Sequence, residues 1–189
     1  MRTLHIAGWI AVTLLLWPWS AAEVDARPFS QRLTGPFASL AAGMEWIRFE
    51  QAWRDGRPER AAVHADRALE LDPLSPQGWI RLGDHFVFER ATPENEPDPE
   101  QRVRWMRTGL DVWKTGQERC SDPGELAMMR GRTLAIYVTE LAKSPEFPWP
   151  GGVRAVREEA RDVLLEAERM GMREAHIVLA ALRRQVQDE

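Results

Sequence analysis

Apolar residues recur every three or four positions along most of the chain after residue 36. The recurrence is clearest at 37–54, where Gly43, Trp46, Phe49 and Trp53 form one stripe, and this spacing predicts an amphipathic helix. The same reasoning predicts further helices at 58–71, 76–90, 99–116, 123–142, 153–170 and 173–186. Because no alternating run predicts a strand, we expect an all-α chain of about seven helices.

Proline and glycine mark the expected ends of these helices. Gly56 predicts a turn, and Pro58 suits the first turn of the helix that follows. Pro73 stops that helix, Pro76 opens the next one, and Gly171 is a suitable cap for the sixth helix. The chain is therefore expected to fold as hairpins of neighbouring helices, with the last helix closing the series.

Part of this pattern occurs nearly twice between residues 46 and 86. The second occurrence is Trp79, Leu82, Gly83 and Phe86, and the preceding turn and helix carry Gly56, Ala61, Ala68 and Pro73. These residues resemble the tetratricopeptide repeat, a helical hairpin with this order of aromatic, small and proline positions. The earlier first helix fits as Trp46, Phe49 and Trp53 if its turn is one residue short, with Glu50 in place of a glycine and Ala65 in place of an aromatic. The resemblance covers about one and a half units.

The resemblance implies a stack of antiparallel helical hairpins over residues 37–189, with a groove lined by the first helix of each hairpin. Such a groove suits an extended peptide or a helix of a protein partner. The polar neighbours of the motif aromatics are the candidate groove contacts: Arg48, Gln51, Arg81, Asp84 and His85. Arg48 and Arg81 stand at comparable points of successive first helices, so we expect them to clamp carboxylates of the partner.

Two proline-rich segments, 92–99 and 145–150, interrupt the pattern. The second segment carries Phe147 and Trp149 between prolines, which stiffen it. Two aromatic side chains on a stiff loop are candidate anchors for a partner's pocket. The alternative is that both rings fold back over the last hairpin and cover its core.

The first 22 residues form a leader. Residues 4–17 are an uncharged apolar run after Arg2, and Ser20, Ala21 and Ala22 follow with the small side chains that signal peptidase selects. The leader is either a bacterial secretory signal cut after Ala22 or an uncleaved membrane anchor through residues 4–19. A buried first helix is a third alternative. For the first two, we expect residues 23–36 to be a linker and the domain to be periplasmic, free or anchored to the inner membrane.

Composition and motifs argue against catalysis and against nucleic acid. The net charge is −4, which is unsuited to neutralising phosphates. Cys120 is the only cysteine, so neither an internal disulfide nor a cysteine-based zinc site can form. The four histidines lack metal-ligand spacing, and no phosphate-binding glycine loop or Gly-x-Ser-x-Gly motif occurs. We expect no cofactor, no metal and no enzymatic activity.

The sequence thus predicts a non-enzymatic scaffold or adaptor of the bacterial cell envelope that binds a peptide or protein. The alternative is a structural subunit docked permanently in a membrane complex through an uncleaved anchor. The identity of the partner and the oligomeric state stay open at this point.

Overall fold

The computed structural model describes residues 37–187, with side chains through Arg184, and all regular secondary structure in this part of the chain is helical. Its elements are α3 (Ala38–Arg54), α4 (Pro58–Leu71), α5 (Pro76–Asp84), the π-helix η2 (His85–Arg90), α6 (Pro99–Gln117), α7 (Pro123–Arg132), the π-helix η3 (Thr133–Val138), α8 (Thr139–Leu141), α9 (Gly152–Arg169) and α10 (Ala175–Gln187). The expected leader at 1–22 and linker at 23–36 lie outside the described residues. None of the described helices has the length and apolarity that a membrane span requires.

The all-α prediction is confirmed for the described residues, and the helix boundaries agree with the predicted ones within a few positions. Four helices begin at a proline, because its fixed φ suits the first turn and its missing N–H costs no hydrogen bond there. The sequence did not predict that two helices change to π-helix part of the way along. α5 continues as η2, and α7 continues through η3 into α8, where the Thr139 hydroxyl donates to the Leu134 carbonyl at 2.9 Å.

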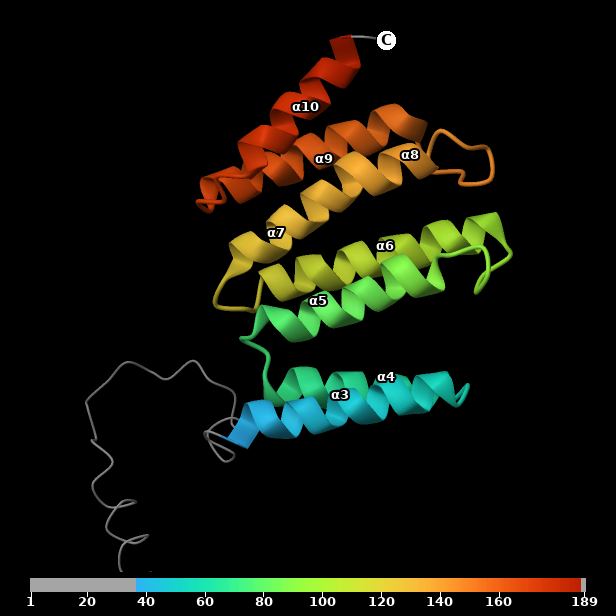
Figure 1. Ribbon diagram of the computed structural model, residues 1–189, viewed down its shortest axis with the longest axis vertical. Coiled ribbons are helices and arrows are strands. Elements are labelled where there is room, and N and C mark those ends of the chain that lie inside the picture. The colour runs from blue at the N-terminus through green and yellow to red at the C-terminus, as the bar shows by residue number, and fades with distance from the viewer. Residues whose placement is uncertain (1–36, 188–189) are drawn as a thin grey trace, which may run out of the picture.

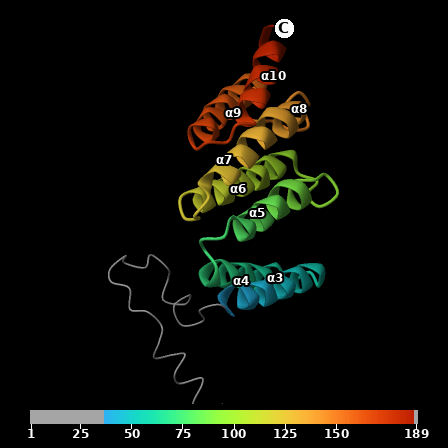
Figure 2. The same ribbon diagram turned by 60° about the vertical axis from the view of Figure 1, so that its left-hand side comes forward.

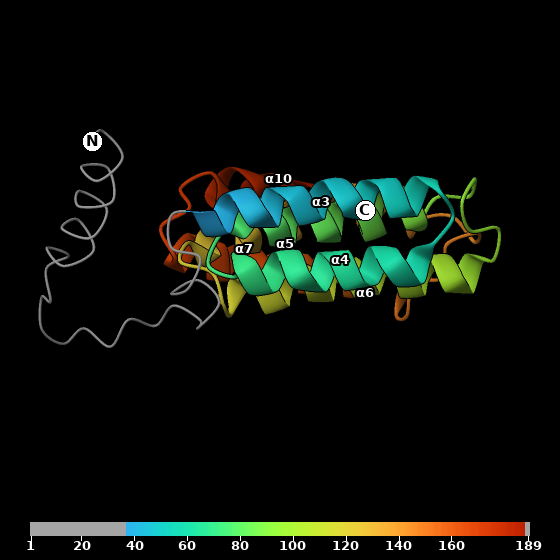
Figure 3. The ribbon, with the colours of Figure 1, turned by 90° about the horizontal axis from the view of Figure 1, so that it is seen from below.

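The helices are arranged as antiparallel pairs in chain order (Figure 1). α3 pairs with α4, α5 and η2 pair with α6, and α7 with η3 and α8 pairs with α9, while α10 packs on α9. The pairs lie one above another in both side views, so each hairpin contacts mainly the hairpins before and after it (Figure 2). At the N-terminal end of the stack α3 and α4 lie side by side (Figure 3).

Small residues determine how closely paired helices approach. Ala61, Ala65 and Ala68 are buried on α4, which makes extensive contact with α3. Between α5 and α6, a Cβ on Gly109 would lie 2.8 Å from the Gly83 carbonyl oxygen, so a larger residue would force the helices apart. These contacts form one continuous core along the stack.

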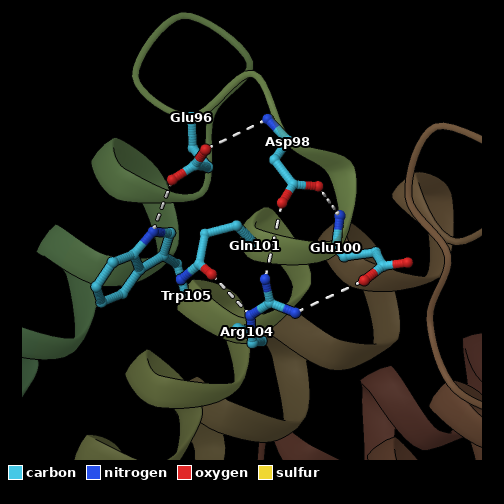
Figure 4. Close-up of polar contacts among 6 residues, drawn as sticks. All are labelled: Glu96, Asp98, Glu100, Gln101, Arg104 and Trp105. Atoms are coloured by element: carbon cyan, nitrogen blue, oxygen red, sulfur yellow. Dashed lines mark hydrogen bonds and ion pairs between the residues drawn. The ribbon is translucent and has the colours of Figure 1, made fainter.

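The segment at 92–99 is fixed by its own polar contacts (Figure 4). The Asp98 carboxylate accepts from the Glu100 backbone N–H at 3.0 Å and caps α6. The Trp105 indole donates to Glu96 at 3.2 Å, and the Arg104 guanidinium lies 3.7 Å from both Asp98 and Glu100. The acidic side chains of this segment therefore serve the start of α6.

Candidate functional site

The structure brings three of the five predicted groove residues together. Arg81 and Asp84 on α5 and His85 at the start of η2 line one cleft, whose opposite wall is α3. Arg48 and Gln51 line a different and smaller hollow of about 200 Å³, next to the turn between α3 and α4. The predicted set is thus divided between two surfaces.

The cleft between α3 and α5/η2 has a volume of about 620 Å³ and is open to solvent. Its apolar lining includes Trp46, Ile80 and Phe88, of which Trp46 is buried and Phe88 is exposed. Gly43 widens the cleft, because no heavy atom lies within 4 Å of the position that its Cβ would occupy. A cleft with this volume and this mixed lining suits a peptide side chain and its flanking backbone.

The two arginines predicted to clamp a partner's carboxylates lie on different surfaces. Arg81 lines the cleft, with its guanidinium 5.7 Å from the centre of the Trp46 ring. Arg48 pairs with Glu45 on the side of α3 that faces α4, where Glu45 also contacts His64. Trp46 faces the cleft, so Arg48, two residues and about 200° further round the helix, faces away from it.

The two motif tryptophans do not line the same cleft. On α3, Trp46 lines the cleft together with Glu50, one turn further along the helix. Trp79, which the motif aligns with Trp46, lines a separate cavity on the α4 and α6 side. The two tryptophans therefore face different surroundings. Counting two positions on from each of them pairs Arg48 with Arg81, although these arginines line different hollows.

His85 is a buried wall residue of the cleft, with only 5% of its surface exposed. Its ring packs edge-on against Phe49 and Trp53, with centroids 5.1 and 4.1 Å away. Burial lowers the pKa of His85, while Glu89, whose carboxylate is 2.9 Å from Nδ1, opposes that shift. A neutral ring that donates its Nδ1–H to Glu89 leaves Nε2 as an acceptor. Nε2 is buried and receives no hydrogen bond from the described residues.

Asp84 provides a second acceptor of the same kind. Its Oδ1 atom is buried and has no donor among the described residues, and burial raises the pKa of its carboxyl group. Buried polar atoms are nearly always hydrogen-bonded, so two unpartnered acceptors from adjacent residues are unusual. A ligand that donates hydrogen bonds would satisfy both atoms.

The cleft continues along the stack. A neighbouring hollow of about 480 Å³ shares Gln77 and Ile80 with the cleft and extends to α7. Met128 and Met129 contribute apolar surface there. The two hollows therefore adjoin at α5, and their lining comes from the first helices of three successive hairpins, α3, α5 and α7.

A hollow of about 830 Å³, larger than the cleft, lies on the α4 and α6 side of the stack. Its lining includes Trp79, whose indole N–H donates to the Pro73 carbonyl at 2.9 Å. None of the buried polar atoms without a partner, among the described residues, belongs to this lining. Asp84 and His85, which carry such atoms, line the cleft between α3 and α5/η2, and this cleft is therefore the better candidate for the site.

The two predicted loop anchors are not exposed. Phe147 and Trp149 each have 4% of their surface accessible, and their rings stack with centroids 6.0 Å apart. Arg107 covers the Trp149 ring at 3.9 Å, and Arg102 donates to the Glu146 carbonyl at 2.6 Å. The segment is held against α6, which corresponds to the alternative in which both rings cover the core and neither reaches a partner.

The described residues were predicted to bind no metal ion. They contain no group of three or more histidine, cysteine or acidic side chains that is placed to hold a metal ion. Burial raises the pKa of the Cys120 thiol, which disfavours the reactive thiolate.

Comparisons with models of protein families, with curated proteins and with solved structures find no match to this chain.

Sequence reasoning missed the α3 side of the cleft, namely Gly43 and Glu50, together with Ile80 and Phe88 on the other wall. Glu50 carried a usable signal, because a carboxylate occupied a position where the motif expects glycine. Gly43 was counted with the apolar stripe of α3, although its side of the helix is exposed.

Proposed function

We propose that this chain is a non-enzymatic binding module that holds an extended segment of a protein partner in the cleft between α3 and α5/η2. The observation that carries the proposal is the pair of buried acceptors, Asp84 Oδ1 and His85 Nε2, in the wall of an open cleft. A bound segment would supply the donors that these atoms lack within the described residues. Binding would then remove the free-energy penalty of two buried acceptors without hydrogen bonds.

The apolar lining and the arrangement of the helices support the same function. Trp46, Ile80 and Phe88 offer surface for apolar side chains, while the acceptors fix the orientation of the bound backbone. The resemblance to tetratricopeptide repeats agrees with this proposal, because stacked hairpins place successive first helices along one groove. We therefore propose a short, modified stack of that kind, in which the groove crosses α3, α5 and α7.

We further propose that the module works outside the cytoplasm. The apolar run at 4–17 and the small residues that end at Ala22 support export, either as a cleaved signal or as an anchor. In both cases the helical domain would lie in the periplasm, and the partner would be a protein of the cell envelope.

Site-specific photo-crosslinking tests the proposed binding surface. Benzoylphenylalanine at Gly43, inside the cleft, should form an adduct with a partner in cells of the source organism, and mass spectrometry should identify a short segment. The matched control is the same residue at Val63, which is exposed on α4 and does not line the cleft. The same adducts at both positions, or none at Gly43, would count against a binding cleft.

The second candidate function, a structural subunit of a membrane complex, is favoured by one observation. α3 has an exposed apolar stripe at the end of the stack: Phe37, Leu40, Met44 and Ile47 are between 50% and 68% exposed. Such a stripe is typical of a surface that another protein covers. Retention of Met1 in the native protein, together with co-purification in a stable complex, would favour this function over a soluble periplasmic adaptor.

A further inference from the structure

The charges around the cleft identify the kind of segment that it suits. Four carboxylate side chains line the cleft with a single arginine: Glu50, Asp72, Asp84 and Glu89, with Arg81. The hollow that continues toward α7 has three carboxylates and again one arginine: Asp122, Glu125 and Glu174, with Arg132. Acidic side chains thus outnumber arginine strongly in both hollows, whereas the whole chain has 25 basic and 29 acidic residues.

The buried atoms of the cleft wall that lack hydrogen bonds give a second, independent indication of the charge of the bound segment. Two unpartnered buried atoms, Asp84 Oδ1 and His85 Nε2, belong to residues that line the cleft. The carboxylate oxygen accepts hydrogen bonds, and Nε2 accepts in the tautomer that donates Nδ1–H to Glu89. Lysine and arginine side chains carry only donors, whereas carboxylates carry only acceptors. A basic side chain that reached these two atoms would supply the missing donors, and an acidic one would not.

The apolar lining also agrees with such a side chain. Arg81 already lies against the Trp46 ring, 5.7 Å from its centroid, so this wall accommodates a guanidinium group. The methylene stems of lysine and arginine bury well against aromatic and aliphatic surface while the charged end contacts carboxylates.

We propose that the partner segment bound in this cleft is basic and carries lysine or arginine side chains that face Glu50, Asp84 and His85. This inference rests on the proposed function and specifies its ligand. It reverses the expectation from the sequence, in which Arg48 and Arg81 would clamp a partner's carboxylates. Electrostatic complementarity of this kind sets both the specificity and the association rate of the complex.

Gly43 allows a direct test, because it lines the cleft and a Cβ atom added there would meet nothing within 4 Å. Random peptides of about a dozen residues are displayed on phage and selected on the wild-type protein. We expect the selected peptides to be enriched in lysine and arginine. Their affinity should increase about two- to fivefold for Gly43→Glu and decrease by a similar factor for Gly43→Lys.

Matched controls separate charge in the cleft from charge elsewhere and from loss of folding. Val63→Glu and Val63→Lys on the exposed side of α4 should leave the affinity unchanged, and thermal unfolding should show that all four variants fold. His85→Phe retains an aromatic ring against Phe49 and Trp53 but removes the acceptor, so it should weaken the selected peptides about tenfold.

The outcomes distinguish this proposal from the proposed function. Selected peptides that are acidic or uncharged, or that keep their affinity for His85→Phe, would overturn the basic-segment proposal. If their affinity still falls when Gly43→Trp fills the cleft, the binding function itself stands. If no selected peptide responds to any change at Gly43, both the basic segment and the binding function are overturned.

Discussion

The contact between Gly83 and Trp113 gives the sharpest test of the packing between α5 and α6. An added Cβ at Gly83 would lie 2.0 Å from Trp113 Nε1 and 2.3 Å from Cδ1. Trp113 is completely buried, and its indole N–H donates to the Ile80 carbonyl at 3.3 Å. We therefore expect Gly83→Ala to displace the ring and destabilise the fold.

The magnitude follows from three contributions. Overpacking of a dense core costs about 1 to 3 kcal/mol. Displacing the indole leaves a buried N–H unsatisfied, which costs a further ~1 to 3 kcal/mol. Replacing glycine by alanine within a helix returns about 1 kcal/mol. The net expectation is a loss of about 3 kcal/mol in the free energy of unfolding, or a decrease in Tm of roughly 6 to 12 °C.

Urea unfolding followed by circular dichroism measures this loss. The matched control is Gly43→Ala, since Gly43 is also in a helix but its Cβ would meet nothing within 4 Å. That variant should be more stable than the wild type by up to about 1 kcal/mol. If Gly83→Ala proves as stable as Gly43→Ala, the close packing of α5 against Trp113 described above is wrong.

Three further predictions concern other parts of the described structure. Glu45→Gln should lower the free energy of unfolding by about 1 to 2 kcal/mol at neutral pH, because the Glu45 carboxylate contacts His64 Nδ1 at 2.6 Å. The hydrogen bond from His64 and the neighbouring Arg48 lower the pKa of Glu45. The wild type should therefore keep this advantage above the ordinary pKa of glutamate and lose it as the pH falls through the lowered pKa, and urea titrations at several pH values check it. Trp149→Ala should lower the free energy of unfolding by about 3 to 5 kcal/mol, because the ring is buried. Trp149→Phe should lower it much less, because the indole N–H has no acceptor among the described residues. Equal losses for the two variants would contradict the burial of this ring. Gly151→Ala should lower the free energy of unfolding by about 1 to 2 kcal/mol, because Gly151 has a φ of 78° and an added Cβ would lie 2.6 Å from the Cβ of Ala155. An unchanged Tm would contradict this turn geometry.

The sequence predicted the helices well because their ends are determined locally. Pro58, Pro76, Pro99 and Pro123 each start a helix by fixing φ, whatever lies around them. The lengths of the helices were predicted from the spacing of apolar residues. The all-α prediction is confirmed for the described residues.

The cleft was only half predictable because it depends on how one hairpin sits on the next. Arg81, Asp84 and His85 were found because they follow the motif tryptophan on a single helix. Which face of α3 lines the cleft depends on the contact between the first two hairpins. A Cβ added to Gly78 would lie 3.3 Å from the Trp46 ring, so Trp46 packs against the backbone of α5 at this point. No spacing within one helix contains that information.

The burial of the segment at 145–150 was unpredictable for a similar reason. Trp149 is covered by Arg107, and the carbonyl of Glu146 is held by Arg102, both from α6. Aromatic residues between prolines suit both an exposed anchor and a folded cover, and only these distant arginines decide between them.

The central claim is that the partner segment binds between α3 and α5/η2, and fluorine NMR of protein labelled with 5-fluorotryptophan tests it most directly. Single Trp→Phe variants assign the signals, and a selected basic peptide is then titrated. We predict that the signal of Trp46, which lines the cleft, shifts with the peptide concentration, while that of Trp79, which lines the α4 and α6 side, stays in place. A shift of Trp79 without a shift of Trp46 would place the binding surface on the other side of the stack and contradict the claim.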